Sequence, residues 1–191
     1  MASKSSFTNM VVVLTAICLI ASALLAVVFN MTKDPIAKAE VAKVNAAISA
    51  VVPEFDNVPS DEVFEIEDGA KVSKVYPAKK GDQIVGYAVE VKSGGFGGPI
   101  QIMVGFTPDG VIYNTSVVAA SGETPGLGAK ILDENIPTRV QLKGLDPAQT
   151  KLVVKNDVGS IDAITASTIT SRGFLKGVEA GYGVFQKIQS K

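Results

Sequence analysis

The sequence lacks histidine and tryptophan altogether and has one cysteine, Cys18. Histidine is the side chain that most often acts as a general base or binds a metal, so those two kinds of site lose their usual residue. A single cysteine cannot form a disulfide, an iron–sulfur cluster or a Cys-x-x-Cys redox pair within the chain. We therefore expect no metal site and no catalysis by histidine or cysteine.

Charge is also sparse. The formal net charge is −1, and the longest basic block is the pair Lys79-Lys80. A nucleic-acid-binding protein would carry a clustered cationic face, so we expect no nucleic acid partner. Carboxylates with the spacing of a calcium-binding loop are missing as well.

One long apolar segment lies near the N-terminus. Residues 10–29 read MVVVLTAICLIASALLAVVF and contain no charged side chain. Twenty residues extend about 30 Å as an α-helix, which is enough to cross a bilayer. A cleaved signal peptide is the main alternative, because Ala21-Ser22-Ala23 resembles a cleavage site, but the apolar run continues to Phe29. A lipoprotein anchored through Cys18 is disfavoured by the bulky Ile17 before it. We expect a retained transmembrane helix.

The charges that flank this segment do not settle its orientation. Lys4 precedes it, and Lys33, Lys38 and Lys43 follow it. A count of cations would place the C-terminal domain inside the cell, but a long domain after one span translocates largely regardless of charge. From charge alone, both orientations stay open.

After the span, Pro35 suits the first turn of a second, amphipathic helix that Pro53 would end. About 140 residues remain, which is enough for one domain with its own core. We predict an N-terminal tail at 1–9, a transmembrane helix at 10–31, a linker helix at 32–54 and one domain at 55–191.

The middle of the chain is typical of β-strands. Apolar runs with loose alternation are separated by short turns, at residues 63–66, 72–76, 84–91, 100–106 and 111–119. Pro108-Asp109-Gly110 between the last two runs indicates a hairpin. Adjacent strands with short turns, and helices at both ends, predict an α+β domain with an antiparallel sheet.

A segment rich in hydroxyl groups precedes the C-terminal helix. Residues 162–171 read DAITASTITS, and apolar residues at helical spacing follow from Phe174 to Phe185. The hydroxyls can simply cap the helix and shape its turn. Alternatively, the helix N-terminus and these hydroxyls bind an anion such as phosphate.

Two glycine-rich segments are candidates for ligand-binding loops. Residues 122–130 read GETPGLGAK, and residues 94–99 read GGFGGP. Either can be a plain surface connection. The first also carries a carboxylate, a hydroxyl, an apolar tip and a lysine between rigid elements, which suits a ligand. The second lacks the spacing of a dinucleotide-binding loop.

These three segments, in this order behind one span, resemble the family of domains that bind FMN covalently. Its attachment motif runs Asp, two residues, Ser or Thr, Gly, Ala, Thr, any residue, Thr or Ser. Asp162, Thr165, Thr168 and Thr170 match it, whereas Ala166-Ser167 replaces the usual Gly-Ala. The family's Glu-Thr-Pro-Gly-Leu-Gly loop matches residues 123–128, and its glycine–aromatic–glycine–glycine segment matches residues 95–98.

The resemblance implies FMN joined through its phosphate to the hydroxyl of Thr168. It implies that Thr165, Ser167 and Thr170, with backbone N–H groups, bind the phosphate. Asp162 would belong to the signal that a flavin transferase recognises. The loops would contact the ring: Leu127 packing on it, Phe96 shielding a face, Lys130 countering charge, Glu123 and Thr124 at the edge, with Gly97 and Gly126 shaping the loops.

Members of this family include the G subunit of the Rnf complex, an ion-translocating ferredoxin:NAD+ oxidoreductase, and the C subunit of the sodium-translocating NADH:quinone oxidoreductase. The length resembles the former. The resemblance therefore implies an electron-carrying flavoprotein subunit in the cell membrane, with its domain extracytoplasmic and with the A, B, C, D and E subunits of Rnf as partners. A quinone reductase subunit, a stand-alone flavoprotein and an anchored binding domain without flavin stay open as alternatives.

Overall fold

The structure is a computed structural model and describes residues 7–68 and 71–190. Residues 1–6 of the predicted tail, including Lys4, lie outside the described residues, as does Lys191. The chain divides into two compact units, Met1–Ala42 and Lys43–Lys191.

A single helix, α1 (Phe7–Val51), covers both the predicted transmembrane helix and the predicted linker helix. Pro35 lies inside α1, so the prediction that it begins a second helix is wrong. Proline lacks an N–H group and costs about 3 kcal/mol in a helix interior. Strong helix formers such as alanine, lysine and glutamate follow Pro35 and favour continuation of the helix beyond it.

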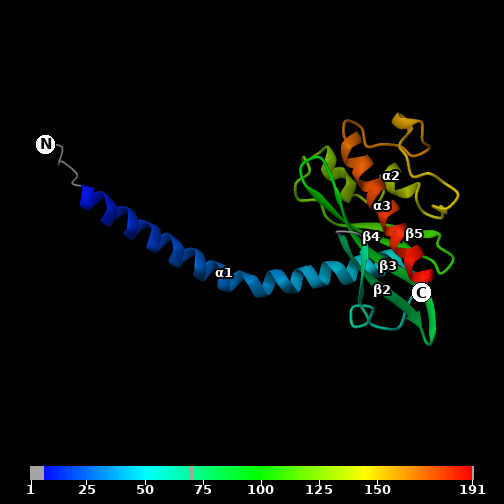
Figure 1. Ribbon diagram of the computed structural model, residues 1–191, viewed down its shortest axis with the longest axis horizontal. Helices are drawn as coiled ribbons and strands as arrows, with labels where there is room; N and C mark the ends of the chain where they lie inside the picture. The colour runs from blue at the N-terminus through cyan, green and yellow to red at the C-terminus, as the bar shows by residue number, and fades with distance from the viewer. Residues whose placement is uncertain (1–6, 69–70, 191) are drawn as a thin grey trace. The chain divides into compact units, whose positions relative to one another are not determined.

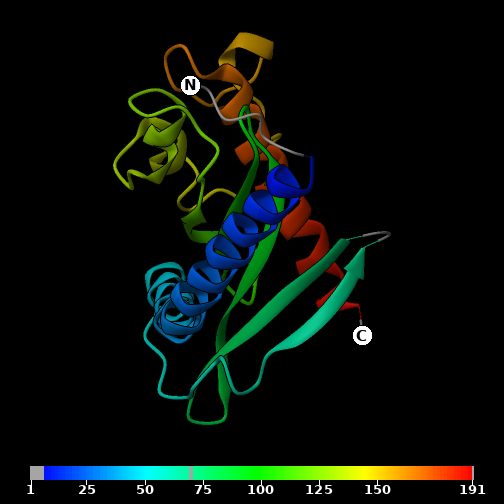
Figure 2. The same ribbon diagram turned by 90° about the vertical axis from the view of Figure 1, so that its left-hand side faces the viewer.

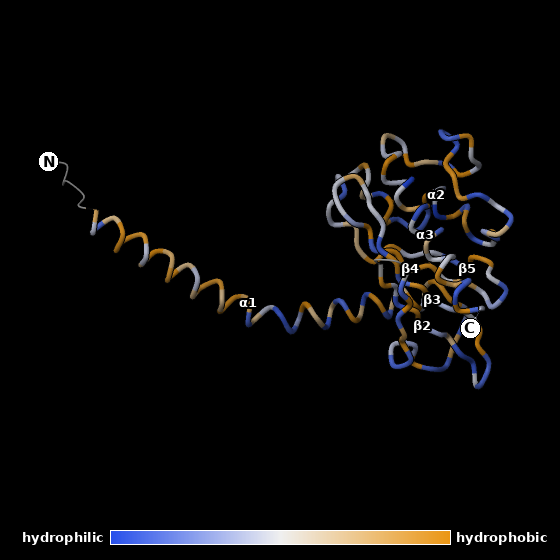
Figure 3. Tube along the Cα trace, in the orientation of Figure 1, coloured by the Kyte–Doolittle hydropathy of each residue, from blue (hydrophilic) through white to orange (hydrophobic). Residues whose placement is uncertain are grey.

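The N-terminal part of α1 is long and apolar enough to cross a membrane. Its most apolar window of 18 residues has a mean hydropathy of 3.0, and none of that window is buried. Figure 3 shows the hydrophobic colour concentrated in the first half of the helix. An amphipathic helix of a soluble domain would instead bury one face.

The second unit is built on a five-stranded antiparallel sheet with strand order β1-β2-β3-β4-β5. This architecture confirms the predicted α+β class. The loop between the last two strands is the predicted hairpin, in which Gly110 has a φ of +87° and its N–H donates to the carbonyl of Thr107 over 2.9 Å. The strands are β1 (Phe64–Asp68), β2 (Lys71–Lys80), β3 (Gln83–Gly94), β4 (Pro99–Phe106) and β5 (Ile112–Ala119).

The two faces of the sheet are covered by helices from opposite ends of the unit. Helix α3 (Thr168–Gln189) packs on one face, and the last turns of α1 pack on the other (Figure 2). The core under α3 includes Val104, Phe106 and Phe174. The core under α1 includes Ile48, Val51 and Met103.

The end of α1 lies close to the sheet because β4 presents a glycine there. A Cβ atom on Gly105 would overlap the carbonyl of Val51. The side-chain amide of Asn114 donates to the carbonyl of Ala50 over 2.8 Å and so satisfies one of the free carbonyls at the helix end. These contacts join the end of α1 to the compact unit Lys43–Lys191.

Helix α3 approaches the other face through a stripe of glycines at every fourth position. A Cβ atom on Gly173 would overlap the carbonyl of Gly94, and one on Gly177 would overlap the end of Ile102. The Ser93 hydroxyl donates to the carbonyl of Gly173 over 2.6 Å. The α3 backbone at Gly173 therefore contacts the β3 backbone directly. This contact sets the distance between the N-terminal part of α3 and the sheet.

The long segment between β5 and α3 gathers around the N-terminal end of α3 (Figure 1). It contains three short helices: η1 (Gly128–Leu132), α2 (Pro137–Val140) and η2 (Lys155–Asp157). A turn at 164–167 then leads into α3. Within it, the Ser167 N–H donates to the carbonyl of Ile164 over 2.9 Å.

This turn requires a left-handed residue. Ala166 has a φ of +58°, at the position where the resembled motif has glycine. The hydroxyl of Ser171 holds the turn, since it accepts from the Ile164 N–H at 2.9 Å and donates to the Ser167 carbonyl at 3.1 Å. An alanine in this conformation costs roughly 1–2 kcal/mol, which the surrounding hydrogen bonds offset.

Two glycines of α3 should respond oppositely to the same substitution. Gly173→Ala should lower the free energy of unfolding by about 1–3 kcal/mol, because its methyl group meets backbone that cannot move aside. Gly183→Ala should raise it by about 1 kcal/mol, because nothing lies within 4 Å of that Cβ and alanine favours helix. Urea unfolding of both variants measures the difference. Equal effects would contradict the close packing.

Ala166→Gly should raise the free energy of unfolding by about 0.5–1 kcal/mol. Glycine removes the strain of the left-handed conformation, and the gain exceeds the added entropy of the unfolded chain. Ala148→Gly is the matched control, because Ala148 is exposed in a turn and is not among the left-handed residues; it should lose about 0.4–1 kcal/mol. Loss of stability in both variants would show that the turn is not strained at Ala166.

Candidate functional site

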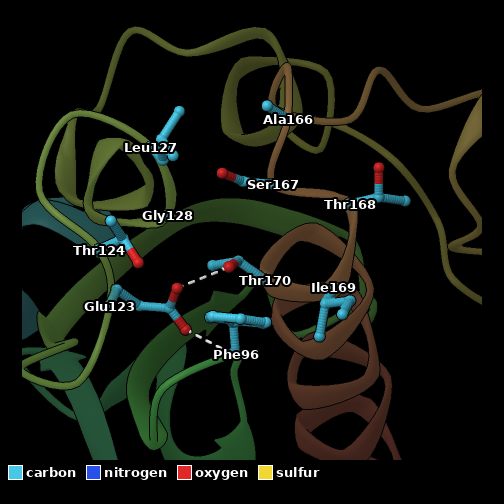
Figure 4. Close-up of a pocket in the computed structure, with 10 residues that line it drawn as sticks. All are labelled: Phe96, Glu123, Thr124, Leu127, Gly128, Ala166, Ser167, Thr168, Ile169 and Thr170. Atoms are coloured by element: carbon cyan, nitrogen blue, oxygen red, sulfur yellow. Dashed lines mark hydrogen bonds between the residues drawn. The ribbon is translucent and has the colours of Figure 1, made fainter.

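A pocket of about 410 Å³ opens at the N-terminal end of α3. That volume lies within the range of small-molecule sites, about 300–1,000 Å³. Figure 4 shows that three parts of the chain form it: the turn into α3, the loop after β5, and the loop between β3 and β4. The residues that line it are Phe96, Glu123, Thr124, Leu127, Gly128, Ala166, Ser167, Thr168, Ile169 and Thr170.

Two of the hydroxyl groups at this helix start are already hydrogen-bonded within the protein. Ser171 holds the turn, and Thr170 donates its only hydroxyl proton to Glu123 over 2.6 Å. Ser167 is the N-cap residue of α3 but makes no side-chain capping bond. The N–H groups of the first turn therefore have no side-chain cap, and an uncapped helix start attracts anions.

Thr168 and Ser167 differ in access. Ser167 is buried, whereas Thr168 is half-buried. Figure 4 shows the Ser167 hydroxyl directed toward the loop that carries Leu127 and Gly128, and the Thr168 side chain at the outer edge of the turn. Of the hydroxyls that α3 and its preceding turn contribute to the pocket, that of Thr168 is therefore the one that can still be approached from outside.

Glu123 joins all three walls of the pocket. Its Oε1 accepts a hydrogen bond from the backbone N–H of Phe96 at 2.7 Å, and its Oε2 accepts one from the Thr170 hydroxyl at 2.6 Å. The residue is 6% exposed. Carboxylate hydrogen bonds of this length are among the stronger ones.

Glycines make room for this carboxylate. A Cβ atom on Gly95 would overlap its Oε1, and one on Gly128 would overlap its Oε2. Gly97 lies against the backbone of Gly122 in the same way, so the two glycine-rich loops touch directly. Both loops are thus built for close approach and are not plain surface connections.

The mouth of the pocket is apolar. Phe96, Leu127 and Ile169 line it and are 66%, 41% and 51% exposed. Exposed apolar side chains clustered beside polar groups are a common feature of ligand sites. The pocket therefore suits a ligand with an anionic end and a flat apolar end.

Asp162 lies outside the pocket and ties residues 162–171 to the rest of the domain. Its carboxylate accepts from Lys155 Nζ at 2.7 Å and from the side-chain amide of Gln141 at 2.5 Å. These two hydrogen bonds, the one from Lys155 first, lower the pKa of Asp162. Its carbonyl accepts from the Thr138 hydroxyl at 2.6 Å. The residue is therefore already engaged within the folded domain.

Most of the residues predicted from the sequence meet at this pocket: Phe96, Glu123, Thr124, Leu127, Ser167, Thr168 and Thr170. Thr165, Gly97, Gly126, Lys130 and Asp162 do not line it. Gly126 has a φ of +75° and shapes the loop, whereas Lys130 is exposed. Gly128, Ala166 and Ile169 line the pocket without having been singled out, although all three lie within or beside the predicted segments.

Sequence reasoning also missed Arg139. It lies on α2, is 4% exposed, and donates to the carbonyls of Thr115 at 2.6 Å and Leu132 at 3.0 Å. Burial lowers its pKa. Since Leu132 ends η1 and Gly128 begins it, Arg139 anchors the loop that carries Leu127 to β5. Nothing in a lone arginine near a proline indicates such burial.

Comparison with known proteins identifies the ligand class. A family model described as the FMN-binding domain matches residues 95–183, the part of the chain that contains the whole pocket. A ligand of this class would suit the combination of an uncapped helix start and an apolar mouth.

The crystal structure of NqrC from Shewanella oneidensis shares the fold, with a TM-score of 0.50, 21% sequence identity, and coverage of 74% of this chain and 73% of that one. The G subunit of the proton-translocating ferredoxin:NAD(+) oxidoreductase complex of Clostridium ljungdahlii is 33% identical over 87% of this chain and 84% of its own. The G subunit of the Na(+)-translocating complex of Acetobacterium woodii is 31% identical over 92% and 90%. The chain therefore belongs to the family of G subunits of the ion-translocating ferredoxin:NAD(+) oxidoreductase complexes.

Proposed function

We propose that this chain is the electron-carrying G subunit of an Rnf-type complex, and that its FMN is joined covalently to Thr168. The observation that carries the proposal is the pocket itself. It combines an uncapped helix start, an accessible hydroxyl on that start and an apolar mouth, within the segment that matches the FMN-binding domain. The other subunits of the complex are its partners.

Thr168 is the best attachment point among the neighbouring hydroxyls. Thr170 and Ser171 are both buried and both engaged in hydrogen bonds. Ser167 is buried, and Thr165 does not line the pocket. A phosphate bonded to Thr168 would lie at the start of α3, where the N–H groups and the helix dipole favour negative charge.

The rest of the pocket suits the other end of the cofactor. Phe96 and Leu127 offer apolar surface for a planar ring, and Thr124 lines the pocket next to Glu123. Bound flavin supplies the redox chemistry, accepting and releasing electrons. The chain positions the flavin and provides the electrostatic environment around it. Neither role requires a histidine or a reactive cysteine.

Covalent attachment has a simple physical benefit. A tethered cofactor is always at its site, the limit of a very high effective concentration. Flavin transferases that recognise the resembled motif would form the bond, so such an enzyme is a further partner during maturation.

Ion translocation belongs to other subunits. The apolar run 10–29 has no charged residue to line an ion path. Two G subunits of nearly equal identity to this chain also come from complexes named for different ions, protons in one and sodium in the other. The choice of ion therefore does not follow from this subunit's type.

We propose a single span with the FMN-binding domain on the extracytoplasmic side. The length and hydropathy of α1 support one crossing, and the orientation rests on the family resemblance. The quinone reductase subunit and the stand-alone flavoprotein are the remaining rivals. The identity to G subunits over most of the chain favours the Rnf-type assembly over both.

Thr168→Ala should abolish flavin attachment. When the chain is co-expressed with a flavin transferase, its intact mass should exceed that of the polypeptide by one FMN less one water, and the denatured band should fluoresce. The alanine variant should show neither signal. Thr168→Ser, which keeps a hydroxyl, and Ser160→Ala, an exposed position outside both the pocket and the motif, are the controls and should remain labelled. Fluorescence in Thr168→Ala would move the bond to another residue.

The orientation can be read with a membrane-impermeant maleimide. In a Cys18→Ser background, Lys151→Cys places one thiol on the exposed surface of the domain. We expect this variant to be labelled in intact spheroplasts, and Ser5→Cys, before the span, to be labelled only after lysis. The reverse pattern would place the domain in the cytoplasm.

A further inference from the structure

We infer that Glu123 is a positioning residue that locks the three walls of the pocket together, and that its buried negative charge makes the bound flavin harder to reduce. The inference rests on the proposed function for its second half. The first half concerns the chain alone.

The geometry separates Glu123 from an ordinary ligand-binding carboxylate. Both of its oxygens accept hydrogen bonds from within the protein, one from the Phe96 N–H and one from the Thr170 hydroxyl. Figure 4 shows the carboxylate between the loop of Phe96 and the first turn of α3, with both bonds drawn. One side chain thereby connects β-hairpin, loop and helix start.

Two glycines line the space that the Glu123 carboxylate occupies. Gly95 and Gly128 approach its two oxygens so closely that a Cβ atom on either would overlap them. Each of the two loops thus has a residue without a side chain where it meets the Glu123 carboxylate. The arrangement holds Phe96 and Thr170 at fixed positions relative to the loop of Leu127.

No ion pair neutralises the charge of Glu123 among the described residues. Among the described residues, the four ion pairs are those of Glu62, Glu54, Asp162 and Asp157, and Glu123 is in none of them. Both of its oxygens act as acceptors, as those of an ionised carboxylate do. A charge in a site with little water acts on its surroundings more strongly than one in water.

This charge opposes reduction. An electron added without a proton to a flavin held here would place one more negative charge in the pocket that Glu123 lines. Repulsion between that charge and the carboxylate disfavours the reduced form and lowers the reduction potential. The electron donor and the electron acceptor of the complex would supply and remove the electrons. Glu123 would therefore change only the reduction potential of the flavin.

Glu123→Gln tests both halves. The amide keeps the size of the side chain but removes the charge, and only one of its two polar atoms can accept a hydrogen bond. In the flavin-loaded chain we expect a more positive midpoint potential than in the wild type, measured by spectroelectrochemical titration. We also expect a lower unfolding temperature of the flavin-free chain.

Glu90→Gln is the matched control. Glu90 also accepts two hydrogen bonds, from the Tyr76 hydroxyl at 2.9 Å and the Gln101 amide at 2.6 Å, but it does not line the pocket. It should lower the unfolding temperature and leave the potential unchanged. An equal shift of potential in Glu90→Gln, or none in Glu123→Gln, would overturn the electrostatic half.

Thr170→Val separates position from charge. It removes the hydroxyl that bonds Glu123 and leaves the carboxylate in place, so the potential should not become more positive. In the flavin-free chain, the double variant with Glu123→Gln should be destabilised by less than the sum of the two single variants, because both break the same bond. Strict additivity would overturn the positioning half. A wild-type chain that carries no flavin would refute the proposed function and the electrostatic half of the inference. The stabilities of the two single variants and the double variant would still decide the positioning half.

Discussion

The pocket depends on one contact, the approach of α3 to the sheet along its glycine face. Gly173 lies on the backbone of Gly94, the last residue of β3. That contact places the first turn of α3 beside the loop that follows β3, where Phe96 and Gly95 lie. Glu123 can then span from this loop to Thr170. Without close backbone packing, the helix start and the two loops would be too far apart for a single carboxylate to join them.

Local chemistry made much of this predictable. Alternating apolar runs and the Pro-Asp-Gly turn predicted the antiparallel sheet, and hydroxyls before an amphipathic stretch predicted the start of α3. Ala166 was noticed because it replaces a glycine, and its φ of +58° gives the physical reason why glycine is usual there. Such features could be predicted because they depend on neighbours in the sequence.

What failed or was missed depends on tertiary contacts. Pro35 predicted a helix start from its local preference, but the helix on both sides continues through it. Arg139 can be buried because it donates hydrogen bonds to carbonyls of β5 and η1, 24 and 7 residues away. The hydrogen bond that Thr170 donates to Glu123, 47 residues earlier, was likewise not foreseen, whereas the prediction that Thr170 binds phosphate stays a prediction. Sequence spacing does not encode which of several hydroxyls receives such a partner.

Two opposite influences therefore act on whatever occupies the pocket. The uncapped start of α3 favours negative charge at Thr168, and the buried carboxylate of Glu123 disfavours it on the far side of Thr170. Their separation suits a ligand whose anionic group and reactive ring lie at opposite ends. The helix start would hold the phosphate end, and the carboxylate would act on the end that changes charge during turnover. Under the proposed function, holding a flavin and setting its potential would thus fall to different groups of the same site.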